Sequence, residues 1–230
     1  IMNNKIIIAV DAMGGENSPK KIIDGLVHFL KNKNNIFFNI FGDENLIKMH
    51  ISDKMHKDVY KIINTEEFVK DEDSAFTGAK NKKTSMWLAV ESVKNQESDI
   101  VISAGNTGAL FVVAKLNLEM IENIDKPALS GLWPNLRGMN VVLDLGANID
   151  CNEKNLIDFS IMGSSLYKAL YPQDELNVAL LNIGSEELKG KEVIKNTYQK
   201  LSDINNNFNF KGYIEANKIM SGDVNVIVTD

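Results

Sequence analysis

Two glycine-rich turns in this sequence follow apolar runs and carry polar groups that could bind an anion. In the first turn, Asp11 comes directly after an apolar run, and Gly14 and Gly15 follow it. Paired glycines let the backbone turn sharply and present N–H groups to a ligand, while Asp11 would face the crevice beyond a strand. We therefore predict that all three bind substrate. A tight turn with a helix-capping acid is equally compatible with these residues.

The second turn combines the most donors that could reach a phosphate or an oxyanion. Gly105 and Gly108 bracket Asn106 and Thr107 at the start of a helix-like run, and Ser103 precedes them. Backbone N–H groups, the Asn106 amide and the Thr107 hydroxyl could all reach one anion there. We predict catalytic contacts by Asn106 and Thr107 and substrate binding by the other three. In the alternative interpretation, Thr107 only caps the helix.

A third loop begins at Asp144 and ends at Cys151. Asp144 and Asn148 flank a Gly-Ala turn, so we expect both to point into the same crevice as the second turn. Asp144 is a predicted substrate-binding residue and Asn148 a predicted catalytic one. No histidine lies near Cys151 in the sequence, and a lone cysteine is more often a small buried residue than a nucleophile.

The fourth loop resembles a P-loop only superficially. Five residues rather than four separate Gly184 from Gly190, and Glu192 stands where a magnesium-binding Ser or Thr is required. Walker chemistry is therefore excluded. Lys189 remains as a cation suited to an anionic substrate and is a predicted catalytic residue, with Gly184, Glu186 and Gly190 as predicted substrate-binding residues. A solvated run of charges is the competing interpretation.

Composition and missing motifs argue against several function classes. The net charge is -6 over 230 residues and no basic stripe appears, so we expect no nucleic-acid partner. The sequence contains no G-x-G-x-x-G fingerprint, no G-x-S-x-G elbow and no Cys or His pair at zinc spacing. We therefore expect no metal and no other cofactor.

Short β-branched runs alternate with longer segments of helical period, which is typical of a mostly parallel sheet covered on both faces. The predicted strands are Lys5–Val10, Ile36–Phe41, Val59–Asn64, Ile100–Ser103, Asn140–Leu145, Val178–Asn182, Phe210–Glu215 and Asn225–Val228. The predicted helices are Ser18–Lys31, with Ser18 as its N-cap, Thr84–Lys94, Thr107–Met120, Leu156–Leu170 and Lys191–Leu201. The polar segment 66–83 interrupts the pattern and is predicted to be either a solvated loop or a functional lid.

We expect one α/β catalytic domain over residues 1–230. No run of about 18 uninterrupted apolar residues occurs, so no segment is predicted to span a membrane. The chain ends one residue past a strand-like run, which would leave one face of the sheet without its crossover helix. We therefore expect the domain to lack its C-terminal part.

Five segments match one protein family in order. They are IAVDAMGGENSP, SAGNTGAL, VVLDLGANIDC, LLNIGSEELKGKE and GYIEANKIMSGDVNVIVTD. Together they resemble the bacterial phosphate acyltransferases, or acyl-ACP:phosphate transacylases, of phospholipid synthesis, and the similarity runs from residue 5 to residue 230. The sequence departs from the family pattern near Ser74 and Ala79, where the family has a proline and an arginine.

The resemblance implies a three-layer α/β/α sandwich with a mostly parallel sheet, related to isopropylmalate dehydrogenase and phosphotransacetylase. It implies that acyl carrier protein (ACP) delivers a fatty acyl group to inorganic phosphate, and that a glycerol-3-phosphate acyltransferase receives the acyl phosphate. It also implies a homodimer in the cytoplasm with peripheral attachment to the inner face of the cell membrane.

Phosphate is itself the nucleophile in this reaction, so the protein must bind two anions and stabilise a thioester oxyanion. We place phosphate near Asn106, Thr107 and Lys189, with Asn148 or the backbone N–H groups of residues 105–108 as oxyanion donors. Asp11 or Asp144 could position phosphate or orient Lys189. Direct contact between either carboxylate and a phosphate dianion requires a proton or a cation between the two groups.

Other functions stay open at this point. A phosphotransacetylase that acts on short acyl-CoA shares the fold and the reaction type. A non-catalytic scaffold module that binds anions or acyl-ACP would show binding without turnover. An NAD-linked dehydrogenase is disfavoured by the missing glycine fingerprint.

Overall fold

The computed structural model describes residues 5–31, 35–51, 54–184, 189–203 and 207–230. The chain divides into two compact units, Ile1–Glu119 and Met120–Asp230, where the sequence led us to expect a single domain. Each unit has its own sheet and its own hydrophobic clusters. The alternation of strands and helices continues through both units, so the sequence pattern carries no mark of the division.

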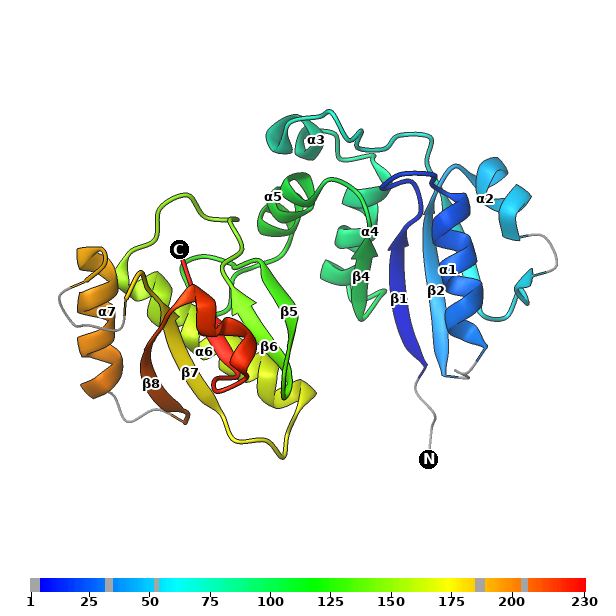
Figure 1. The fold of residues 1–230 in the computed structure, drawn as a ribbon. Coiled ribbons are helices and arrows are strands. Elements are labelled where there is room, and N and C mark those ends of the chain that lie inside the picture. Colours follow the sequence, from blue (N-terminus) through cyan, green and yellow to red (C-terminus); the bar gives the residue numbers. More distant parts are fainter. Residues whose placement is uncertain (1–4, 32–34, 52–53, 185–188, 204–206) are drawn as a thin grey trace. The chain divides into compact units, whose positions relative to one another are not determined.

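The first unit is a parallel four-stranded sheet in the order β3-β2-β1-β4, with helices on both faces (Figure 1). Buried side chains of α1 and α2, such as Ile23 and Ile47, pack on the face that carries Val10. On the opposite face, Ala89 of α4 packs against Ala9. The elements are β1 (Ile6–Asp11), α1 (Lys20–Leu30), β2 (Ile36–Gly42), α2 (Glu44–Ile51), β3 (Tyr60–Asn64), α3 (Ala75–Lys80), α4 (Ser85–Lys94), β4 (Ile100–Ser103) and α5 (Thr107–Asn117).

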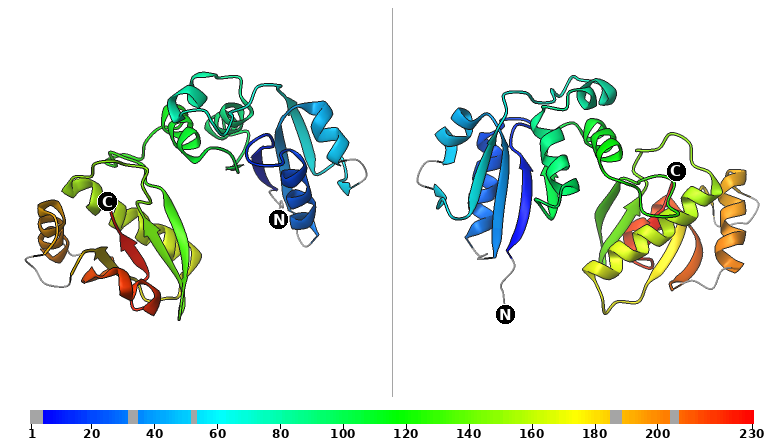
Figure 2. Two further views of the ribbon diagram at one scale, coloured as in Figure 1. Left: turned by 45° about the horizontal axis from the view of Figure 1, so that its top comes forward. Right: turned by 180° about the vertical axis from the view of Figure 1, so that it is seen from behind.

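The second unit is a five-stranded sheet in the order β5-β6-β9-β7-β8, parallel except for the edge strand β5. The long helix α6 crosses one face of this sheet (Figure 2), and α7 packs in the same hydrophobic cluster. The short helix η2 contributes Ile219 to the cluster on the other face. The elements are β5 (Ser130–Asn135), β6 (Gly138–Leu143), α6 (Glu153–Leu170), β7 (Asn177–Leu181), α7 (Glu192–Asp203), β8 (Asn209–Ile214), η2 (Ala216–Ser221) and β9 (Val226–Val228).

The predicted class, an α/β fold with mostly parallel sheets and helices on both faces, is confirmed. All eight predicted strands and all five predicted helices are present, β4 with the predicted bounds and the others with shifted ends, whereas α2, α3, β5 and η2 were not predicted. The predicted N-cap was wrong, because the Ser18 hydroxyl donates to the carbonyl of Gly14 and the helix begins at Lys20. No helix within the described ranges is both long and apolar enough to cross a membrane.

Truncation of Phe159 should destabilise the second unit strongly. This side chain of α6 is fully buried in the main cluster of that unit. Loss of a buried aromatic ring leaves a cavity and typically costs about 3–5 kcal/mol. Urea unfolding should show this loss for Phe159→Ala, whereas Ile161→Ala on the same helix, where the side chain is 45% exposed, should cost far less. Equal losses in the two variants would contradict the assigned packing.

Candidate functional site

The turns after β1 and β4 meet at the carboxylate of Asp11, which is 1% exposed. Oγ of Ser85 donates a hydrogen bond of 2.6 Å to Oδ1 of Asp11, and Oγ of Ser103 donates one of 2.7 Å to Oδ2. The backbone N–H of Met13 adds a longer bond of 3.3 Å to Oδ1. Across the described ranges these donors satisfy the carboxylate without an ion pair. Asp11 thus lies at a strand end, but its oxygens are bonded to the protein.

Glycines bring these two turns into backbone contact. A Cβ atom on Gly14 would lie 2.6 Å from Oδ2 of Asp11 and 2.8 Å from the backbone nitrogen of Gly105. Gly15 has a φ of 88°, and a Cβ atom there would lie 2.5 Å from the carbonyl oxygen of Ala104. Close packing between the turns therefore explains why glycine is needed at both positions.

The Asn106 side chain has a structural role that the sequence did not reveal. Its Oδ1 accepts a hydrogen bond of 2.9 Å from the N–H of Ala109, so Asn106 is the N-cap of α5, and the alternative of a Thr107 cap does not hold. Its Nδ2 donates to the carbonyl oxygen of Asp73 at 3.0 Å and to that of Asp71 at 3.4 Å. Both ends of the amide are therefore already bonded within the protein.

The start of α5 nevertheless keeps donors for an anion. Thr107 and Gly108 are exposed. Among the described residues, none accepts a hydrogen bond from the backbone N–H groups of Asn106, Thr107 and Gly108. The first N–H groups of a helix attract anions because they have no internal acceptor and because the helix dipole is positive there.

The polar segment 66–83 is anchored to the first unit at several points. Val69 is 4% exposed and packs in one cluster with Ala79 of α3, Trp87 of α4 and Ala109 of α5. The Asn106 amide holds the backbone of residues 71–73, as described above. A pocket of about 320 Å³ lies between residues 68–72 and the turn that contains Gly15. The interpretation of this segment as a merely solvated loop is therefore wrong for its central part.

In the second unit, Asp144 organises the loop that follows β6. Its carboxylate accepts hydrogen bonds from the N–H of Leu129 at 2.8 Å, the N–H of Asn148 at 2.7 Å and the N–H of Ala147 at 3.3 Å. Nδ2 of Asn148 donates to Oδ2 of Asp144 and to the carbonyl oxygen of Pro127, each at 2.9 Å. Both amide protons of Asn148 are therefore used, and an oxyanion could receive one only if a protein contact broke.

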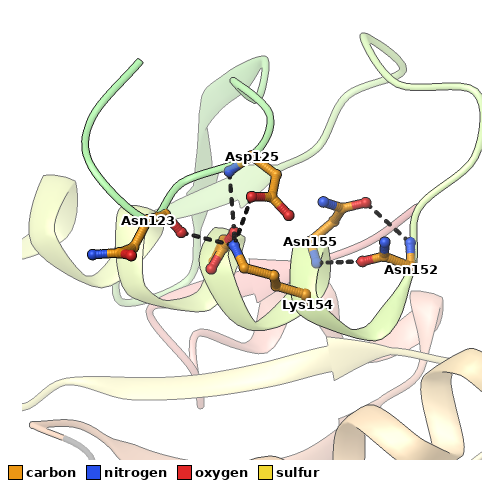
Figure 3. A network of polar contacts seen from close by, with 6 residues as sticks. Asn123, Asp125, Asn152, Lys154 and Asn155 are labelled. Atoms are coloured by element: carbon orange, nitrogen blue, oxygen red, sulfur yellow. Dashed lines mark hydrogen bonds and ion pairs between the residues drawn. The ribbon is translucent and has the colours of Figure 1, made fainter.

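The same loop leads into a firmly capped helix (Figure 3). Asn152 and Asn155 form a reciprocal capping box at the start of α6. Nζ of Lys154 lies 3.1 Å from Asp125 and donates to the carbonyl oxygen of Asn123 at 2.7 Å. These contacts fix residues 123–125 against the start of α6.

The amide of Asn182, which the sequence did not single out, bonds to the described residues of the fourth loop on both sides of positions 185–188. Its Nδ2 donates to the carbonyl oxygens of Gly184 at 3.1 Å and Lys189 at 3.0 Å. Gly190 has a φ of 95°, and a Cβ atom there would lie 2.1 Å from Oδ1 of Asn182, so only glycine fits. The Lys189 side chain is exposed, and Glu186 lies outside the described residues.

A pocket of about 790 Å³ opens beside this loop at the carboxyl ends of β7 and β9. Lys191 and Asp230, which both line it, form an ion pair of 2.7 Å, and the hydrogen bond that Nζ of Lys191 donates to the Asp230 carboxylate raises the pKa of Lys191. Lys191 is a second cation beside this loop, and we had predicted it only as the first residue of a helix. Apolar and polar groups both line the pocket, among them Leu181, Ile183, Ile194, Asn182, Lys191 and Asp230.

The predicted site residues thus fall into two sets. In the first unit the structure brings together Asp11, Gly14, Gly15, Ser103, Gly105, Asn106, Thr107 and Gly108. In the second unit it joins Asp144 to Asn148 and, separately, Gly184, Lys189 and Gly190 around Asn182. The sequence missed Ser85, which reaches Asp11 from another element.

In both units a pocket lies beside loops at the carboxyl ends of parallel strands. The whole chain has the fold of the phosphotransacylases. It is similar to the EutD phosphotransacetylase from Staphylococcus aureus, with a TM-score of 0.68, 13% identity, and coverage of 99% of this chain and 78% of that one. It is also similar to a branched-chain phosphotransacylase from Enterococcus faecalis V583, with a TM-score of 0.59, 15% identity, and coverage of 97% and 79%. At these identities the likeness shows the fold alone.

The sequence comparison identifies the family. A family model described as "Fatty acid synthesis protein" matches residues 6–230, and the chain belongs to that family. It is 64% identical over 231 residues to the phosphate acyltransferase of Pelagibacter ubique (strain HTCC1062), covering 100% of this chain and 69% of that protein. It is 37% identical over 231 residues to the phosphate acyltransferase of Paramagnetospirillum magneticum, covering 100% and 66%. The chain thus spans about two thirds of the length of these relatives, and the predicted resemblance to phosphate acyltransferases is confirmed.

Replacement of Asp144 by asparagine should destabilise the second unit. The new amide would point an N–H group at neighbours that are themselves N–H donors, and a lost hydrogen bond to a buried charged group costs about 1.5–3 kcal/mol. Urea unfolding of Asp144→Asn should show a loss of that size. Asp150→Asn, at an exposed position in the same loop, is the control and should change stability by less than about 0.5 kcal/mol. An unchanged midpoint for Asp144→Asn would contradict the role of this carboxylate.

Cys151 should react slowly with alkylating reagents. Burial raises the pKa of its thiol, and the carboxylate of Asp144 raises this pKa further, so less thiolate is present near neutral pH than in a free cysteine. Alkylation by iodoacetamide should therefore be at least about tenfold faster in urea than in the folded protein. If the protein transfers acyl groups to phosphate, Cys151→Ala should keep the full rate of that reaction. Loss of the reaction in a folded Cys151→Ala protein would favour Cys151 as a nucleophile.

Proposed function

We propose that this chain belongs to an enzyme that transfers a fatty acyl group from acyl-ACP to inorganic phosphate. Support comes from the family and from the names of relatives that match the whole chain at 37–64% identity. The structural observation that carries the proposal is the start of α5, where Thr107 is exposed and three successive backbone N–H groups have no acceptor among the described residues.

The chemistry requires that the protein position two anionic substrates. An oxygen of hydrogen phosphate attacks the thioester carbonyl carbon, a C–O bond forms, and the C–S bond breaks. The proton of hydrogen phosphate ends on the sulfur of the released ACP thiol. The protein can accelerate this step by positioning phosphate and by donating hydrogen bonds to the oxygen that becomes negative.

In the first unit, we assign phosphate to the backbone N–H groups of residues 106–108 and to the Thr107 hydroxyl. The Asn106 side chain supports this loop through its cap and its contact to residues 71–73, and a contact with phosphate is not needed for that role. We assign Asp11 no direct contact with phosphate, because both of its oxygens already accept hydrogen bonds from the protein.

In the second unit, the 790 Å³ pocket is the proposed place for part of the acyl-ACP substrate. Apolar side chains such as Leu181 and Ile194 suit an acyl or pantetheine chain. Lys191, the cation of this lining, suits an anionic group if its ion pair with Asp230 opens. Asn148 remains a proposed oxyanion donor only if it gives up its bond to Pro127 or Asp144.

ACP is the proposed acyl donor, and a glycerol-3-phosphate acyltransferase is the proposed acceptor of the product. A homodimer in the cytoplasm, attached peripherally to the inner face of the membrane, is part of the same proposal. The names of the relatives support the acyl transfer in this proposal, and the assembly and location follow only from the resemblance to the family. Co-sedimentation with anionic lipid vesicles and measurement of mass in solution test these two properties.

The proposed activity is tested on the full-length protein. Palmitoyl-ACP is incubated with and without phosphate, hydroxylamine traps any acyl phosphate, and mass spectrometry identifies the hydroxamate. We expect hydroxamate only when phosphate is present, and we expect acetyl-CoA to be a much poorer donor. A preference for acetyl-CoA would favour a short-chain phosphotransacetylase, and binding of acyl-ACP without turnover would favour a scaffold.

A further inference from the structure

Ser85 lies at the point where α4 begins and where β1 ends. Successive residues of a strand point to opposite faces of the sheet, so Asp11 shares a face with Ala9. Ala9 packs against Ala89 of α4, which identifies that face as the one covered by α4. Ser85 is the first residue of α4, and its hydroxyl therefore meets the carboxylate of Asp11 at 2.6 Å.

Ser85 cannot act by touching a substrate. Its side chain is fully buried, and in the described part of the chain its hydroxyl donates to Asp11 alone. Its backbone N–H donates to the carbonyl oxygen of Glu67 at 2.9 Å, which ties α4 to the polar segment 66–83. Any effect of the hydroxyl on chemistry must therefore pass through Asp11.

The hydrogen bonds beyond Asp11 have only one consistent direction. The N–H of Gly105 donates to Oγ of Ser103 at 3.2 Å. A hydroxyl has a single proton, so the proton of Ser103 goes to Oδ2 of Asp11 at 2.7 Å. The chain of donors runs from Ser85 to Asp11 on one side, and from Gly105 through Ser103 to Asp11 on the other. Gly105, the outermost donor of this series, lies one residue before the backbone N–H groups assigned to phosphate.

The carboxylate depends on these hydroxyls because it is buried and forms no ion pair within the described ranges. Without the Ser85 hydroxyl, the one donor left to Oδ1 of Asp11 in the described part of the chain would be the N–H of Met13 at 3.3 Å. A buried carboxylate that loses a donor rotates or draws in water to recover one. Either change would release Ser103 from its present orientation and, with it, the turn at Gly105.

We propose that Ser85 is a positioning residue for the phosphate-binding turn, acting through Asp11 and Ser103. The inference rests on the proposed function, because it assumes that phosphate binds at residues 106–108. Ser85 belongs to α4, which lies outside the four loops predicted to form the site.

A double-mutant cycle on the full-length protein tests this role. Ser85→Ala should lower kcat/KM for phosphate by about 10- to 100-fold, the size expected for a hydrogen bond to a charged group, and should leave the KM for palmitoyl-ACP unchanged. In an Asp11→Asn background, the same substitution should cost less than about threefold, because the two residues act as one unit. Equal losses in both backgrounds, or none in either, would overturn the proposal.

The matched control is Ser92→Ala on the same helix. Ser92 is also buried, and its hydroxyl bonds to the carbonyl of Ala89 and to Ser98, away from the site. It should leave kcat/KM for phosphate unchanged. If Ser85→Ala does not fold, Ser85→Cys takes its place in the cycle, since it nearly keeps the volume and weakens the donor.

Hydrogen exchange of the Gly105 amide gives a readout that needs no turnover. Exchange should be faster in Ser85→Ala than in the wild-type protein and unchanged in Ser92→Ala. A wild-type protein without phosphate-dependent turnover would contradict the proposed function. Wild-type turnover that Ser85→Ala preserves, with Gly105 exchange unaltered, would contradict the role of Ser85 alone.

Discussion

A buried carboxylate that pairs with no cation must be held by hydrogen-bond donors. Asp11 is in this position among the described residues of the first unit, and its donors come from several elements at once. Ser85 from α4 and Ser103 from β4 supply the two short bonds, and glycines at 14 and 105 let the turns close around them. A side chain on Gly14 would enter the space of the carboxylate itself. The geometry at the start of α5 follows from this arrangement, because Gly105 is bonded to the same serine that is bonded to Asp11.

The second unit uses the same device in a different form. Asp144 directly follows a strand and is also buried, but backbone N–H groups of its own loop and of Leu129 take the place of the serine hydroxyls. Its neighbour Asn148 is occupied by the same carboxylate and by Pro127. In both units, therefore, a buried carboxylate shapes the loop at the carboxyl end of a strand. Under the proposed function, phosphate contacts N–H groups and not these carboxylates, which would avoid the repulsion between a carboxylate and a phosphate dianion.

Sequence periodicity predicted the parallel strands and the five longer helices because each has a strong apolar pattern. It missed β5, an antiparallel edge strand that contains Pro134, and it missed α3, which has only six residues. The positions of the loops were predicted correctly, since each follows a strand. The roles of their side chains were harder to predict. Asn106 looks like a ligand in sequence, yet its amide caps α5 and holds residues 71–73, and Ser85 lies 74 positions from the carboxylate that it serves.

The central claim is that phosphate binds at the turn after β4, and a crystal structure of the full-length protein with bound phosphate tests it most directly. The claim predicts phosphate oxygens within hydrogen-bond distance of the backbone N–H groups of Thr107 and Gly108, with the contacts of Asp11 to Ser85 and Ser103 intact. Phosphate bound at another place, with residues 106–108 unoccupied at saturating phosphate, would contradict it.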